Sequence, residues 1–127
     1  MRECGECKLC CQGLLTGNTR GSWFGNLVAC KYLDNKCTIY EDRPSQCRNY
    51  YCAWAQELLP LWMQPNLINV IVSVEIDETG KQFLNIISAN EVSNKIISEI
   101  NKFTQTNNSY FKQTRIIPIR STNVSIL

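Results

Sequence analysis

Hydrophobic and polar residues alternate most regularly in the second half of the chain. From Ile68 to Ile76 an aliphatic residue occupies every second position, which predicts a β-strand with one buried face; we expect this strand to begin at Leu67. The segment 77–80 ends in glycine and is typical of a hairpin loop, so residues 82–87 are predicted to return as a second strand. The pattern indicates a β-hairpin that needs a covering layer on its apolar face.

A helix is predicted to supply that layer. The segment 88–91, Ser-Ala-Asn-Glu, fits the capping box that opens many helices. The hydrophobic residues that follow share one helical face: Val92, Ile96, Ile97, Ile100 and Phe103. The polar run 106–109 ends the helix. A further strand is predicted over 115–120, at a sheet edge because Pro118 has no N–H to donate, and 123–127 is its candidate partner.

The first half of the chain shows short hydrophobic runs that glycines interrupt. Residues 4–11 are predicted to lead from a loop into a short helix, and several glycines then mark a loop around Trp23. A short hairpin is predicted over 31–40 and a short helix that carries Cys47 follows it. A second helical stretch is predicted over 53–59, before a link that contains two prolines.

All eight cysteines lie in the first 52 residues, which we call the cysteine half: Cys4, Cys7, Cys10, Cys11, Cys30, Cys37, Cys47 and Cys52. The chain has no histidine, so the usual base of a cysteine nucleophile is missing and zinc sites that include histidine are excluded. No apolar leader follows Met1, so we expect a cytoplasmic protein whose thiols stay reduced. Reduced, clustered thiols indicate metal binding rather than disulfides.

Two kinds of metal centre fit the cysteine pattern. Eight thiolates make two closed, four-coordinate Zn²⁺ sites with none left over. Adjacent side chains point in different directions, so we expect Cys10 and Cys11 to serve different sites, or one of them not to be a ligand. The run Cys4-x-x-Cys7-x-x-Cys10 also matches three ligands of a ferredoxin-type [4Fe–4S] cluster, although the chain does not continue as a ferredoxin does. We favour Zn²⁺ and keep the [4Fe–4S] cluster, with a redox or enzyme-accessory role, as the alternative.

Metal binding by the first half and the strand and helix patterns of the second half together predict the organisation of the chain. We predict an α+β protein in which an irregular, cysteine-rich, metal-stapled module over 1–57 is followed by a β-hairpin and helix layer over 66–127. The 127 residues are enough for one compact unit of this kind. The second layer would be a platform for the first.

Composition limits the partners. The formal charge is +2, and no stretch reaches the ~20 apolar residues that cross a membrane. Aromatic residues interleaved with arginine and lysine in the cysteine half can stack single-stranded nucleic acid, which is a second alternative. Packing around a metal is the stronger interpretation of the same residues. The acidic pairs at 41–42 and 77–78 support no active site. We therefore expect a protein partner rather than nucleic acid or a membrane.

The cysteine half also resembles a known family. Four blocks carry the resemblance: Cys4-x-x-Cys7-x-x-Cys10-Cys11, Cys30-Lys31-Tyr32-Leu33, Cys37-Thr38-Ile39-Tyr40 and Arg43-Pro44-x-x-Cys47-Arg48. Their order and spacing resemble the CxxCxxCC cysteine-cluster family, which implies a zinc- or iron-chelating domain over 4–52 with the eight cysteines as ligands. Some relatives carry the cluster beside a flagellin lysine methylase region. This chain shows no S-adenosylmethionine loop, so methyl transfer is not carried over.

Two arginines of these blocks are candidates for the surroundings of the metal. Arg43 and Arg48 can donate N–H groups to thiolate sulfur or to nearby carbonyls, which would offset the negative charge of a four-thiolate site. The alternative is that both are solvated surface side chains.

Overall fold

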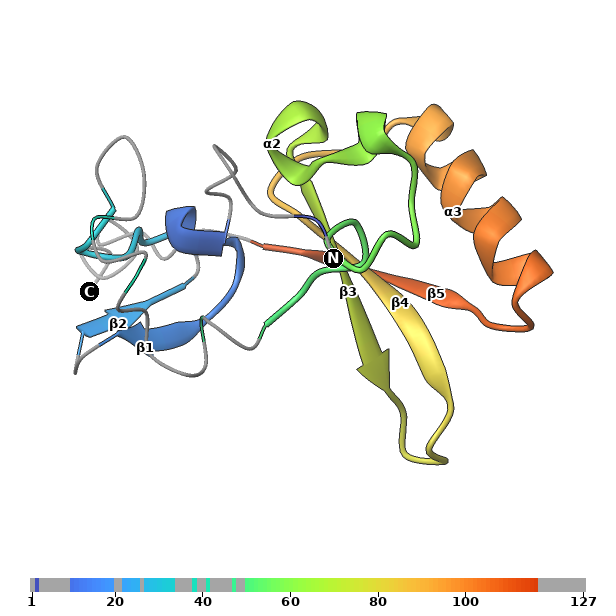
Figure 1. Cartoon of the computed structure of the whole chain (residues 1–127), viewed down its shortest axis with the longest axis horizontal. Coiled ribbons are helices and arrows are strands. Elements are labelled where there is room, and N and C mark those ends of the chain that lie inside the picture. The colour runs from blue at the N-terminus through green and yellow to red at the C-terminus, as the bar shows by residue number, and fades with distance from the viewer. Residues whose placement is uncertain are drawn as a thin grey trace, which may run out of the picture.

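The computed structural model describes the following residues: Arg2, 10–19, 22–25, 27–33, Thr38, Glu41, Cys47 and 50–116. Within them the fold is α+β, as predicted, with helices and a small mixed sheet (Figure 1). The sheet has the order β3 (Val70–Ile76), β4 (Gln82–Ser88), β5 (Phe111–Arg115), and α3 (Asn94–Thr106) lies alongside it. We call these four elements the sheet layer.

The predicted β-hairpin is confirmed. Strands β3 and β4 are antiparallel from Val70 to Ile76, and their β-branched residues suit a pleated, packed surface. In the connecting loop the Asp77 carboxylate accepts hydrogen bonds from the backbone N–H groups of Thr79 (2.9 Å) and Lys81 (3.0 Å). Gly80 takes a φ of 85°, a left-handed conformation that glycine adopts without steric cost. The loop is therefore fixed by one carboxylate and one glycine.

The helix begins later than predicted. Its N-cap is Ser93, whose side chain accepts from the Ile96 N–H at 3.5 Å, so the prediction of a capping box over 88–91 is wrong. Ser88 ends β4 instead, and its hydroxyl donates to the Asn90 carbonyl at 2.7 Å. Ser88 precedes Val92 by four residues and Ser93 precedes Ile96 by three, so both have the spacing of an N-cap and the sequence alone does not separate them. Ile96 and Ile100 are buried, which confirms the central part of the predicted apolar face.

The third strand of the sheet, β5, lies earlier in the chain than predicted. The prediction of a strand beginning at Arg115 is wrong, because β5 ends there and pairs in parallel with β4 from Leu84↔Phe111 to Ser88↔Arg115. Its sequence is mostly polar and its side chains are mostly exposed, so it has no alternating signal. Parallel pairing requires a crossover connection, and α3 supplies it. The predicted strand over 117–120 and its partner at 123–127 lie outside the described residues.

Strand β3 also begins later than predicted, at Val70 rather than Leu67. The chain first forms a short 3-10 helix, η3 (Leu61–Met63), and one turn of helix, α2 (Pro65–Ile68), with proline at a position that favours helix initiation. Asn69, at a φ of 56°, ends α2 and redirects the chain into the sheet.

Residues 53–59 form a turn instead of the predicted helix. The Leu58 N–H bonds the Ala53 carbonyl at 3.1 Å and the Glu57 N–H bonds the Trp54 carbonyl at 3.0 Å. Glu57 itself has a left-handed backbone, with a φ of 64°. These nested bonds around a left-handed residue form the pattern that commonly ends helices, so the chain makes one turn here and does not continue as a helix.

The described part of the cysteine half consists of short elements. A short coiled segment, η1 (Cys10–Leu14), which is kinked at Gly13, precedes a small hairpin of β1 (Gly17–Thr19) and β2 (Ser22–Phe24), so the prediction of a loop around Trp23 is wrong. Gly13 has a φ of 97°, and an added methyl group there would lie 2.6 Å from the Leu27 backbone. The segment therefore requires glycine at this position for conformation and for space.

One cluster of buried side chains joins the sheet layer to residues that precede it. Its most completely buried large members are Met63, Ile71, Ile86 and Ile100. Leu14 of η1 and Cys52 belong to the same cluster. Figure 1 shows η1, β1 and β2 beyond one end of the sheet, on the side away from α3. Among the described residues, no helix is long and apolar enough to cross a membrane.

Candidate metal centre

The eight predicted ligands are described to different extents. Cys30 and Cys52 are buried, and Cys47 is half-buried. Cys10 and Cys11 are described as the first two backbone positions of η1. Cys4, Cys7 and Cys37 lie outside the described residues, as do Arg43 and Arg48. The assignment of these two arginines beside a metal therefore stays a prediction.

Cys52 lies where the cysteine half meets the sheet layer. The next residue, Ala53, donates its backbone N–H to the Val72 carbonyl at 2.7 Å, which attaches this segment to the outer edge of β3. The Cys52 carbonyl accepts the Gln56 N–H at 3.0 Å, which starts the turn over 53–58. Cys52 is thus held on rigid backbone, a property that suits a metal ligand.

Arg2 connects the start of the cysteine half to this same segment. Its backbone N–H donates to the Ala55 carbonyl at 2.8 Å. Its guanidinium donates to the carbonyls of Leu59 (2.6 Å) and Trp54 (3.1 Å), and lies 5.1 Å from the centre of the Trp54 ring. Our sequence reasoning missed Arg2, because one arginine near the start of a chain carries no pattern.

Backbone hydrogen bonds also shape the chain at Cys30 and at Thr38. The Leu33 N–H bonds the Cys30 carbonyl at 3.0 Å, which forms a turn directly after the cysteine. Thr38 donates both its N–H (2.8 Å) and its hydroxyl (2.7 Å) to the Tyr32 carbonyl. These contacts lie in the region of the predicted hairpin over 31–40, of which 34–37, 39 and 40 lie outside the described residues. Cys47 has helical backbone, in agreement with the helix predicted to carry it.

The chemistry of the donor set fits zinc or an iron–sulfur cluster. Soft thiolate sulfur is the ligand that both prefer, and the buried Cys30 and Cys52 offer it away from water. In the described part of the chain, no three cysteine or carboxylate groups come together as a possible metal site. The grouping of the eight cysteines into sites therefore stays a prediction.

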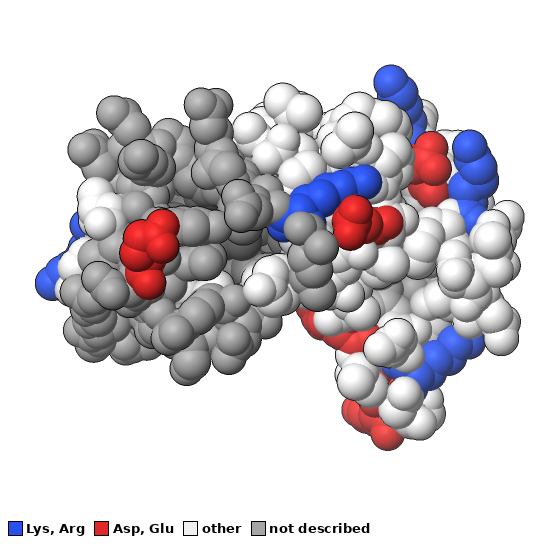
Figure 2. All heavy atoms as spheres, in the orientation of Figure 1, with Lys and Arg blue, Asp and Glu red and all other residues white. Residues whose placement is uncertain are grey.

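The aromatic residues of the cysteine half and of the segment directly after it differ in their exposure. Phe24 and Trp54 are buried, and the Trp54 ring also donates its N–H to the Leu61 carbonyl at 3.2 Å. Neither ring face is open for base stacking. Trp23 and Tyr51 are exposed by 45% and 42%. On the described part of the face drawn in Figure 2, basic and acidic side chains are interspersed rather than gathered into a basic stripe.

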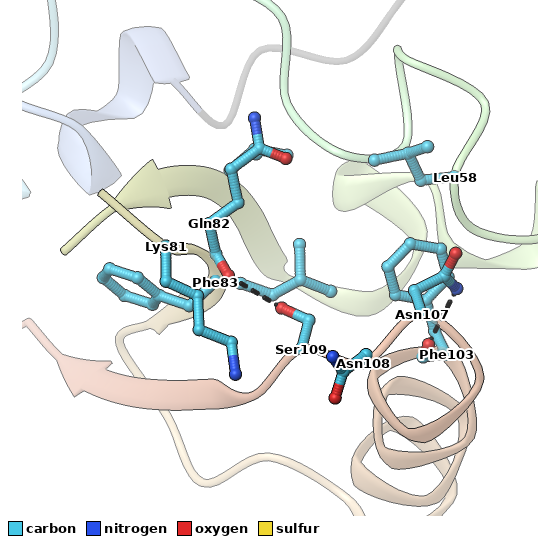
Figure 3. Close-up of a pocket in the computed structure, with 10 residues that line it drawn as sticks. Leu58, Lys81, Gln82, Phe83, Phe103, Asn107, Asn108 and Ser109 are labelled. Carbon is cyan, nitrogen blue, oxygen red and sulfur yellow. Dashed lines mark hydrogen bonds between the residues drawn. The ribbon is translucent and has the colours of Figure 1, made fainter. Parts of the chain in front are cut away.

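A hollow of about 410 Å³ lies where the start of β4 meets the end of α3, beside Leu58 (Figure 3). Leu58, Val74, Leu84 and Phe103 supply its apolar lining. Its polar groups come from the start of β4 and the end of α3: Lys81, Gln82, Asn107, Asn108 and Ser109. The Ser109 hydroxyl donates to the Gln82 carbonyl at 2.9 Å and the Asn107 amide to the Phe103 carbonyl at 2.8 Å, so both groups serve the fold. The lining residues offer one ammonium group but no pair of acid and base groups.

A hydrogen-bonded pair closes the hairpin loop against the start of β5. The Tyr110 hydroxyl donates to the Asp77 carboxylate, and the Tyr110 ring stacks on Phe83 with centroids 5.1 Å apart. Hydrogen bonds from the Thr79 hydroxyl and from Tyr110 hold the pKa of the Asp77 carboxyl far below its usual range. The same bond raises the pKa of Tyr110 to about 12. The acidic pair at 77–78 thus includes one carboxylate with a structural role.

Comparison of the chain with protein-family models, with curated proteins and with solved structures gives no match.

Proposed function

We propose that this protein binds metal through the eight cysteines of its first half, with two Zn²⁺ ions in all-cysteine sites that hold an interaction module together. The proposal includes membership of the CxxCxxCC cysteine-cluster family and a cytoplasmic location, where thiols stay reduced. The metal would have a structural role, and the module that it holds would contact a protein partner.

The observation that carries this proposal is the small number of buried hydrophobic side chains among the described residues of the cysteine half. Among the described residues of the first 50, only Leu14, Phe24 and Cys30 are buried hydrophobics, and one of them is a cysteine. Hairpins with strands as short as β1 and β2 are marginal in water without further support. Structural zinc supplies an apparent binding free energy of ~10–16 kcal/mol, which would stabilise a segment with few buried side chains of its own.

Metal analysis of anaerobically prepared protein tests the proposal. We expect two zinc ions per chain, because eight cysteines fill two four-coordinate sites. Cys52→Ser should remove one of them. The matched control is Ala53→Ser, which places the same hydroxyl group at the adjacent buried position and should retain both ions.

The outcomes separate the alternatives. Wild-type protein without tightly held metal, or Cys52→Ser protein with full zinc content, would reject the two-site zinc assignment. Iron and acid-labile sulfide in place of zinc, with visible charge-transfer absorbance, would instead establish the [4Fe–4S] alternative and a redox or accessory role.

A further inference from the structure

Arg2 makes four separate contacts with the segment that follows Cys52. One is the backbone hydrogen bond to Ala55, two are guanidinium hydrogen bonds to the Trp54 and Leu59 carbonyls, and the fourth is the contact with the Trp54 ring. Both carbonyl bonds come from one guanidinium nitrogen, Nη1, while the planar group also covers the aromatic face. An ammonium group has the charge and several donors, but it has no plane to lay against the ring.

The segment that receives Arg2 is itself fixed to the sheet layer. Ala53 bonds β3, Trp54 is buried, and the turn over 53–58 is closed by its own hydrogen bonds. Arg2 is therefore attached to a rigid part of the molecule.

The contact joins the two ends of the cysteine half. Arg2 precedes Cys4 by two residues, and Trp54 follows Cys52 by two residues. Two residues of chain span at most ~7 Å, so each of these cysteines is tied closely to a contacting residue. The contact closes the long loop that contains all eight cysteines, and the entropy of that closure no longer opposes metal binding.

We propose that Arg2 is a positioning residue for the metal centre: it holds the N-terminal cysteine run against the Cys52 segment and thereby slows the release of metal. This inference rests on the proposed function. It assigns to Arg2 a role that neither the cysteine spacing nor the family resemblance indicates.

Zinc transfer from the loaded protein to a chromophoric chelator, under native conditions, measures this role. For Arg2→Ala we expect transfer to be at least about tenfold faster, because the variant loses two hydrogen bonds from a charged group and its contact with the ring. Arg2→Lys keeps the charge but loses the planar group that bonds the carbonyls and covers the ring together, so its transfer rate should lie between those of wild type and Arg2→Ala. Cobalt-substituted protein gives a second readout, because the thiolate-to-cobalt absorption band reports the geometry of the site. This band should change in Arg2→Ala.

Two controls distinguish positioning from general stabilisation. Lys95→Ala removes a comparable contact between a cation and Trp62, 4.5 Å from the ring centre, outside the cysteine half, and should leave the transfer rate unchanged. Ile96→Val weakens the core of the sheet layer, where Ile96 is buried. If it accelerates transfer as much as Arg2→Ala at an equal loss of stability, the inference is overturned.

The failures are distinguishable. Wild-type protein that holds no thiolate-bound metal overturns the proposed function and the role of Arg2 together. Loaded wild-type and Arg2→Ala proteins with equal transfer rates and equal cobalt spectra overturn the role of Arg2 alone.

Discussion

The described residues of the cysteine half and those of the sheet layer differ in what holds them in place. Each long strand of the hairpin contributes several buried aliphatic side chains, and Ile71, Ile86 and Ile100 are almost completely buried. Hydrophobic burial accounts for this part of the fold without any further group. Residues 10–33 contribute mainly Leu14 and Phe24 to the interior, and their strands have three residues each. Metal in the cysteine half would therefore contribute to the stability of this region as much as to its function.

The largest expected effect is metal removal. Chelation under reducing conditions should abolish hydrogen-exchange protection at the amides of β1 and β2, because the cysteine half has lost its cross-links. The amides of β3 and β4 should keep most of their protection, since most of the side chains buried between them and α3 are aliphatic. Hydrogen exchange followed by mass spectrometry resolves the two regions. Equal loss of protection in both would show that they unfold as one unit.

The second effect is a cavity in the sheet layer. Ile86→Ala removes a fully buried side chain from the central strand and should lower the free energy of unfolding by ~2–5 kcal/mol, measured by urea denaturation. Ile76→Ala, at a position that is 65% exposed, is the matched control and should cost less than ~0.5 kcal/mol. Similar costs for the two variants would contradict the assignment of the core.

The third effect contrasts two glycines in left-handed backbone, one in each region. Gly80→Ala meets open space and should cost only ~1–2 kcal/mol of conformational strain. Gly13→Ala carries the same strain and also overlaps the Leu27 backbone, so η1 must shift and the cost should be larger. Gly13→Ala should also reduce metal content, because η1 begins with two of the predicted ligands. Thermal unfolding and zinc analysis of both variants check the contrast.

The smallest effect is electrostatic and belongs to the sheet layer. The folded pKa of Asp77 lies below its ordinary value of 3.8, so its stabilising contribution is present above that pH and is lost as the pH falls. The folded pKa of Tyr110 is raised from 10.0 to about 12, so its contribution is present below pH 10 and is lost as the pH rises through this interval.

Asp77→Asn should therefore lower the urea midpoint at neutral pH, and the difference from wild type should shrink towards about pH 3. Glu78→Gln changes the neighbouring exposed carboxylate and serves as the control. A difference between wild type and Asp77→Asn that stays constant with pH would show that the Asp77 charge is not responsible.

The parts of the fold that the sequence predicted are those with regular side-chain patterns. The alternation in β3 and the glycine of the hairpin loop located the hairpin, and the spacing of Ile96 and Ile100 located α3. Strand β5 could not be found in this way, because it lies at the side of the sheet with most of its side chains exposed. The turn over 53–58 was mistaken for a helix because left-handed Glu57 has no sequence signal comparable to glycine.

The chemistry proposed for the candidate site follows from the sequence, whereas its surroundings do not. The clustering of the cysteines indicated soft-metal ligands from composition and spacing alone. The attachment of Cys52 to the edge of β3 and the contacts of Arg2 depend on pairs of residues that are far apart in the chain. No local pattern records such contacts, so only the three-dimensional structure could reveal them.

The two ends of the sheet differ in how they are connected to the rest of the chain. Val70, Ser88 and Arg115 lie together at one end, so the chain both enters and leaves the sheet layer there. The other end carries the loop over 77–81 and the link between α3 and β5, which connect elements only of the sheet layer itself. A label or a peptide inserted beside exposed Glu78 would therefore be remote, along the chain, from both connections. The sheet layer therefore has one end that suits insertions and one end where both connections to the rest of the chain lie.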